Sequence, residues 1–196
     1  MRWSVLPVSV AALLVAAPGA QAHLMNSGFG PFYDGLAHPF VVAEDLIPVV
    51  ALGLLAGLGG ARRGRWMLFG LTLSWAVGMA VGSVVLGPAA PDWWTGGGAI
   101  VLGALVAADR RLPLGVVAGL AAVVGGTHGF GNGRELAGAT GGALAMAGIV
   151  CALFALSSLL AGHVTSLKSS GARLVVRVAG SWVAAIGLLM LGWALR

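Results

Sequence analysis

The sequence predicts an all-α protein, a polytopic bundle of about six transmembrane helices that follow a cleaved signal peptide. Two observations lead to this prediction. Of the 196 residues, 59% are hydrophobic and only 9% are charged, whereas a soluble domain carries about 25% charged residues. The 33 glycines agree, because glycine is frequent in membrane helices and lets them pack closely. This composition excludes a cytosolic enzyme, a nucleic-acid-binding domain and a disordered tail.

The first element is an export signal over residues 1–22. Arg2 provides a basic start, an apolar run covers residues 5–17, and Ala20-Gln21-Ala22 fits the small-residue pattern that signal peptidase cuts. The apolar run is shorter than the roughly 20 residues that span a bilayer. We therefore expect cleavage after Ala22, which leaves a transmembrane domain of residues 23–196 that begins with His23.

Six apolar stretches recur along this mature chain, each a candidate membrane span. They are Leu36–Leu58, Trp66–Leu86, Gly97–Ala108, Leu114–Phe130, Leu136–Ala161 and Leu174–Leu195. Pro48 is expected to kink the first span, because proline removes a backbone hydrogen bond from a helix. The five glycines between Gly125 and Gly133 predict a partly irregular backbone where the fourth span ends.

The basic residues predict the orientation of the spans. If the mature N-terminus lies outside the cytoplasm, the loops after the first, third and fifth spans are cytoplasmic and hold eight basic residues. These are Arg62, Arg63, Arg65, Arg110, Arg111, Lys168, Arg173 and Arg177. The opposite side holds Arg134 and Arg196. This positive-inside asymmetry predicts a multi-pass protein of the cell membrane with both mature termini extracytoplasmic. It also explains the net charge of +5 without a nucleic-acid partner.

Two acidic residues and a histidine open the first span. His38 and Asp45 are seven residues apart, nearly two helical turns, so they share one helical face, and Glu44 is turned about 100° away. A carboxylate at this depth is costly unless it faces a cavity or a partner. The pair Glu44-Asp45 therefore indicates either a cation site or a proton relay.

A second polar group lies where the fourth span meets the fifth. In a helix, His128 and Glu135 fall on one face, with Asn132 between them, which we interpret as structural. Imidazole and carboxylate without thiolate are ligands suited to Ni²⁺, Co²⁺ or similar divalent metals. Taken alone, His38 is also compatible with an interfacial polar residue, and His128 with a hydrogen-bond donor between helices. The predicted metal ligands, all on the outer side, are His23, His38, Glu44, Asp45, His128 and Glu135.

Both segments resemble the motifs of one known family. His38-Pro39-Phe40, followed by Glu44-Asp45-Leu46, resembles the first motif of the HupE/UreJ family, and the segment from His128 to Glu135 resembles the second. The resemblance implies a nickel or cobalt permease that serves hydrogenase and urease maturation. The positions that match the motifs are His38, Glu44, His128, Gly129, Gly133 and Glu135. Two positions depart from the family pattern, because Asp45 and Asn132 stand where the family has histidines. These departures leave cobalt, manganese, zinc or another cation open besides nickel.

The expected function is therefore a permease whose substrate is a divalent metal ion, with no tightly bound cofactor and no enzymatic activity. Its expected partners are the metal ion, the lipid bilayer, a second copy of the chain or the proteins that mature a metalloenzyme. Two other functions stay open. One is a metal-binding or assembly subunit that does not transport. The other is a proton-coupled carrier of a small solute, with Glu44 and Asp45 as the relay.

Overall fold

The computed structural model describes residues 27–85, 87–88, 90–91 and 93–196, and within them the regular structure is helical throughout. The all-α fold class is thereby confirmed. The helices are α2 (Pro31–Val41), α3 (Ala43–Leu58), α4 (Ala61–Gly82), α5 (Trp93–Ala107), α6 (Leu114–Glu135), α7 (Gly142–Ser166) and α8 (Ser170–Ala194). The predicted signal peptide and His23 lie outside the described residues.

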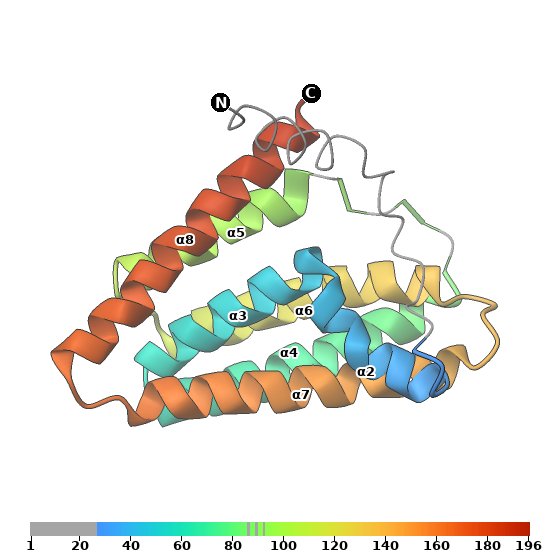
Figure 1. The fold of residues 1–196 in the computed structure, drawn as a ribbon, viewed down its shortest axis with the longest axis horizontal. Helices are drawn as coiled ribbons and strands as arrows, with labels where there is room; N and C mark the ends of the chain where they lie inside the picture. The colour runs from blue at the N-terminus through green and yellow to red at the C-terminus, as the bar shows by residue number, and fades with distance from the viewer. Residues whose placement is uncertain (1–26, 86, 89, 92) are drawn as a thin grey trace, which may run out of the picture.

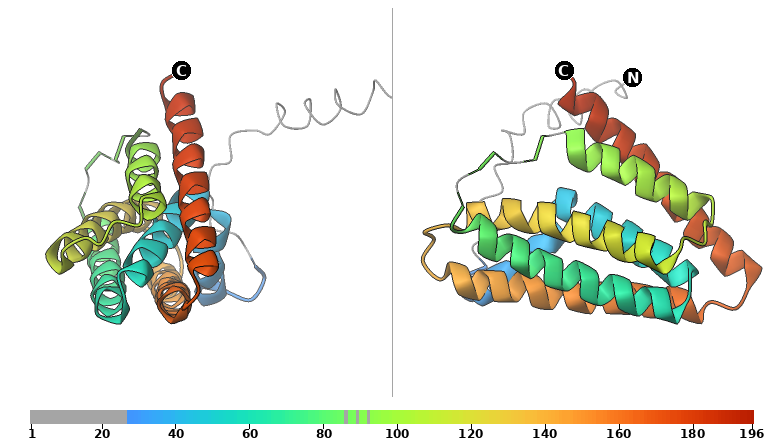
Figure 2. Two further views of the ribbon diagram at one scale, coloured as in Figure 1. Left: turned by 90° about the vertical axis from the view of Figure 1, so that its left-hand side faces the viewer. Right: turned by 180° about the vertical axis from the view of Figure 1, so that it is seen from behind.

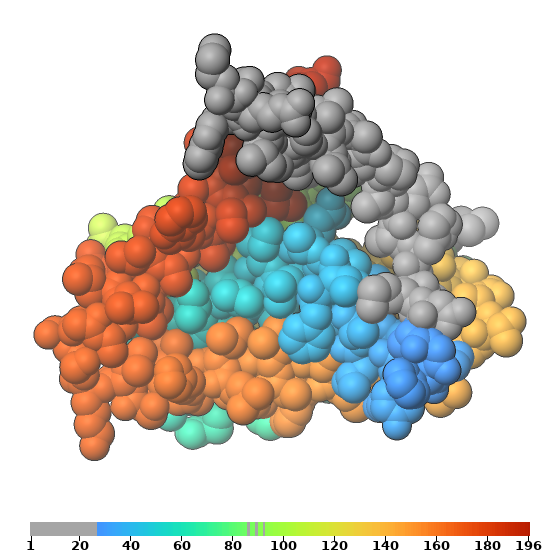
Figure 3. Space-filling view, in the orientation of Figure 1, coloured from blue at the N-terminus to red at the C-terminus, as the bar shows by residue number. Residues whose placement is uncertain are grey.

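The helices form two groups that meet at α3. Helix α4 packs against α6 and α7, and these three run side by side along the molecule (Figures 1 and 2). Helices α5 and α8 pack against each other and cross this group at an angle. Helix α3 contacts α4, α5 and α7, so it lies between the two groups. In the space-filling view α3 remains visible between α8 and α7 (Figure 3).

Several of these helices have the length and composition of membrane spans. Among the described residues, α6, α7 and α8 are each long and apolar enough to cross a bilayer. Helices α2 and α3 pass the same test when taken together as one broken span. Helix α5 is apolar but has only 15 residues. These findings support a multi-pass membrane protein, and the count of six spans stays a prediction.

The first predicted span is wrong as a single helix. The chain bends by 70° between α2 and α3, at Val42, whose φ of −94° and ψ of 98° are extended. Pro39 lies inside α2 and lacks an N–H, and the β-branched Val41 and Val42 follow it, so the helix is weak at this point. Helix α3 continues through Pro48 without a break, so the kink expected at that residue stays a prediction.

The glycine-rich end of α6 is regular helix, which overturns the irregular backbone predicted for it. The glycines serve close packing instead, since a Cβ atom on three of them would collide with the backbone of α4. The three contacts, spaced by one turn, are Gly125 with Leu71, Gly129 with Trp75 and Gly133 with Met79. This close approach of α4 and α6 brings their side chains together around the site described next.

Candidate metal site

The break between α2 and α3 places His38 against Asp45. His38 lies in the last turn of α2 and Asp45 in the first turn of α3. The His38 Nε2 atom is 3.2 Å from Asp45 Oδ2, and the two residues are only 4% and 3% exposed. The positive end of the α3 dipole favours a carboxylate in the first turn. The pairing predicted from helical spacing is therefore present, although the bend between the helices produces it.

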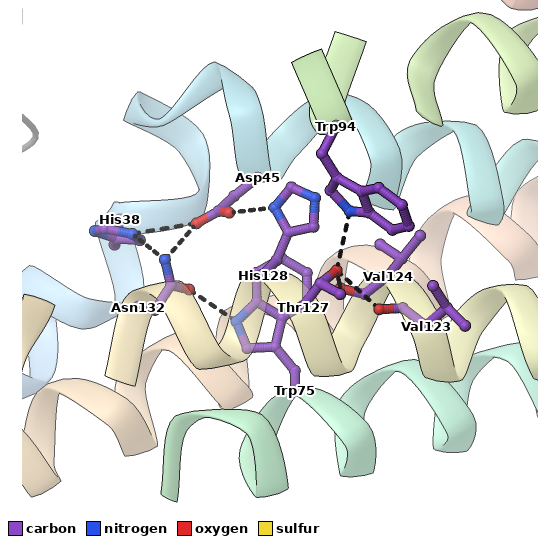
Figure 4. A network of polar contacts seen from close by, with 9 residues as sticks. All are labelled: His38, Asp45, Trp75, Trp94, Val123, Val124, Thr127, His128 and Asn132. Atoms are coloured by element: carbon purple, nitrogen blue, oxygen red, sulfur yellow. Dashed lines mark hydrogen bonds and ion pairs between the residues drawn. The ribbon is translucent and has the colours of Figure 1, made fainter. Parts of the chain in front are cut away.

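Helix α6 adds two more polar side chains to the Asp45 carboxylate. His128 Nδ1 lies 3.0 Å from Asp45 Oδ1, and the amide nitrogen of Asn132 donates to Asp45 Oδ2 at 3.0 Å (Figure 4). The same amide nitrogen is 3.3 Å from His38 Nε2. Three helices thus converge on one buried carboxylate. We call His38, Asp45, His128 and Asn132 the central cluster.

Helix α4 supports this cluster through Trp75, a residue that the sequence analysis did not identify. The indole Nε1 of Trp75 donates to Asn132 Oδ1 at 2.8 Å, and its ring lies 5.5 Å from that of His128, tilted by 30°. The structure gives Asn132 a defined place, because its amide donates directly to Asp45. Asn132 could have been assigned to the site from the sequence, because it lies one helical turn from His128. Nothing in the sequence around Trp75 distinguishes that tryptophan from a packing residue.

The other two predicted acids lie apart from the central cluster. Glu44 is exposed, although it precedes Asp45 directly, and Glu135 is exposed at the last residue of α6. Glu135 interacts electrostatically with His38, Asp45 and Glu44, so its carboxylate lies within range of the cluster. The structure therefore brings together His38, Asp45 and His128 of the predicted ligands, and leaves both glutamates at its edge.

The side chains of the central cluster already contact one another through hydrogen bonds and close polar contacts. Within the described part of the chain, no group of three or more His, Cys, Asp or Glu side chains is arranged to hold a metal ion as it stands. The two imidazoles contact different oxygens of Asp45 and lie on opposite sides of it (Figure 4). A cation that binds here must replace at least one of these contacts.

A multi-helix membrane protein with a buried polar cluster at a broken helix is the class that this fold and site define. Discontinuous helices of this kind form substrate sites in many transporters. A family model described as "HupE / UreJ protein" matches residues 11–190, and the chain belongs to the HupE/UreJ family. The comparisons with curated proteins and with solved structures gave no match.

Proposed function

We propose that the protein is a membrane permease for a divalent transition-metal ion, nickel or cobalt, and that His38, Asp45 and His128 bind the ion. The observation that carries this proposal is the contact of two imidazoles, buried His38 and partly buried His128, with one buried carboxylate at the break between α2 and α3. Imidazole nitrogen suits Ni²⁺ and Co²⁺, and the carboxylate supplies the charge that offsets loss of water from the ion. Membership of the HupE/UreJ family supports the same conclusion.

The exposed acids Glu44 and Glu135 would attract the ion before it reaches the cluster. Both carboxyl groups are exposed at the edge of the site, and an acidic rim raises the local concentration of a cation. His23, predicted to be the first mature residue, would act one step earlier. We place this entrance outside the cell, because the positive-inside distribution assigns the opposite ends of the helices to the cytoplasm. A divalent ion that enters a cell at −100 mV gains about 4.6 kcal/mol, so uptake needs no nucleotide.

The test is binding and flux measured on the same purified protein. Wild-type protein in proteoliposomes is expected to bind Ni²⁺ or Co²⁺ and to take it up when the inside is negative, and the double variant with His38→Ala and His128→Ala is expected to do neither. Binding without flux would identify a metal-binding or assembly subunit instead. If the metal ion neither binds to the protein nor competes with a transported solute, the permease proposal is wrong. The remaining alternative is then the proton-coupled carrier of a small solute.

Single-cysteine labelling tests the orientation on which the entrance depends. In a Cys151→Ser background, Ala139→Cys in the α6–α7 loop is expected to react with an impermeant maleimide added to intact cells, because that loop is predicted to be extracytoplasmic. Lys168→Cys in the α7–α8 loop is expected to react only after the cells are permeabilised. Both positions are exposed, so a reversed pattern would mean that the chain inserts the other way round.

A further inference from the structure

We propose that Trp75 determines the cation selectivity of this site, by fixing which end of the Asn132 amide faces the bound ion. The inference rests on the proposed function and concerns a residue outside the ligand set. Trp75 is fully buried and touches two members of the central cluster, Asn132 through its indole N–H and His128 through its ring. It is therefore placed to control the site without binding the ion itself.

The chemistry of the indole ring decides the orientation of the amide. An indole N–H can only donate, so it takes the amide oxygen of Asn132, which is the acceptor of that group. The NH₂ end must then point the other way, where it lies 3.0 Å from Asp45 Oδ2 and 3.3 Å from His38 Nε2. An ionised carboxylate only accepts, so the contacts on both sides of Asn132 require the same orientation.

This orientation removes Asn132 from the ligands available to a cation. An amide NH₂ group has no lone pair to offer and carries partial positive charge, whereas the amide oxygen is a good ligand for hard cations such as Mn²⁺. The metal ligands that remain are the ring nitrogens of His38 and His128 and the carboxylate of Asp45. A site with two imidazole nitrogens and a single carboxylate favours Ni²⁺ and Co²⁺, which bind imidazole well, over Mn²⁺ and Mg²⁺, which prefer oxygen ligands.

The packing of α4 on α6 prevents Trp75 from relaxing away from Asn132. Gly129 lies against the backbone of Trp75 itself, so close that a Cβ atom at residue 129 would meet that backbone. The indole ring is 0% exposed and is held between Asn132 and His128. The amide orientation is thus built into the helix contact, and it does not depend on a mobile surface residue.

The test is the ratio of Mn²⁺ to Ni²⁺ affinity, measured by equilibrium binding to purified full-length variants. Trp75→Phe keeps an aromatic ring beside His128 and removes the N–H, which frees Asn132 to turn its oxygen toward the ion. We expect the Mn²⁺/Ni²⁺ affinity ratio to rise by about tenfold, the size of one net hydrogen bond. In the double variant Trp75→Phe with Asn132→Leu the rise should disappear, because no amide oxygen remains.

A matched control uses a tryptophan far from the site. Trp182→Phe on α8, where Trp182 is 68% exposed, should leave both affinities unchanged. If wild-type protein binds no metal, the proposed function fails. If wild-type protein binds metal but Trp75→Phe leaves the ratio unchanged, or weakens Mn²⁺ and Ni²⁺ equally, Trp75 is structural support only and the selectivity role is wrong. The persistence of the rise in the double variant would also overturn it.

Discussion

Replacing Asp45 by Asn is expected to lower the initial rate of Ni²⁺ or Co²⁺ uptake at least about 100-fold, because loss of a buried charge partner costs about 3–5 kcal/mol. The Asp45 carboxylate is the group that His38, His128 and Asn132 all contact. Asparagine has nearly the same shape but supplies neither the charge nor the second acceptor oxygen. The measurement is metal uptake into proteoliposomes that hold equal amounts of each variant.

Glu44→Gln is the matched control for this prediction, since it removes the neighbouring carboxylate. Glu44 is exposed and lies outside the central cluster. Removing its charge should therefore slow uptake by no more than about threefold. The effect should be smaller at high salt, as expected for a screened surface charge. Size-exclusion profiles of both variants show whether they remain folded. Equal loss of uptake in two folded variants would contradict the assignment of Asp45 as the central acid.

Gly129→Ala is expected to destabilise the protein by about 1–3 kcal/mol, the usual cost of forcing extra volume into a packed interior. The added Cβ would collide with the backbone of Trp75, so α4 and α6 must separate. This separation would also stretch the 2.8 Å bond between Trp75 and Asn132. We therefore expect both a lower melting temperature in detergent and weaker metal binding.

Gly131→Ala provides the control on the same helix, two residues away. A Cβ atom at residue 131 meets nothing within 4 Å, and alanine favours helix over glycine by up to about 1 kcal/mol. This variant should melt at the same temperature as the wild type or slightly higher. If both alanine variants melt alike, the close packing of α4 on α6 does not limit stability.

Much of the fold follows from local sequence patterns. Long apolar stretches predicted helices that overlap α4, α5, α6, α7 and α8, with ends shifted by a few residues. The predicted and observed ends differ because an apolar run and a helix need not coincide. Helix α4, for example, begins with a segment that contains three arginines, before its apolar part. The break at Val42 was missed, since Pro48 offers an equally good local reason for a kink but α3 accommodates it.

The candidate site was predictable only in part. His38, Asp45 and His128 stood out because polar groups are rare in apolar spans, and the structure brings these three together. Helical spacing placed Asp45 on the face of His38, whereas the motif resemblance matched Glu44, so both acids remained candidates from the sequence. Both acids lie in the first turn of α3, but only Asp45 is buried and contacts the side chains of α6.

The sequence by itself determined the class of protein, its family and the residue types available for a cation site. These depend on composition, on motif spacing and on the cost of polar groups in lipid, all of which are local properties. Only the tertiary structure decided that Asp45 is the central acid, and that Trp75 and Asn132 complete its surroundings. The physical reason is that these contacts join α2, α3, α4 and α6, and their distances depend on how closely the glycines of α6 let α4 approach.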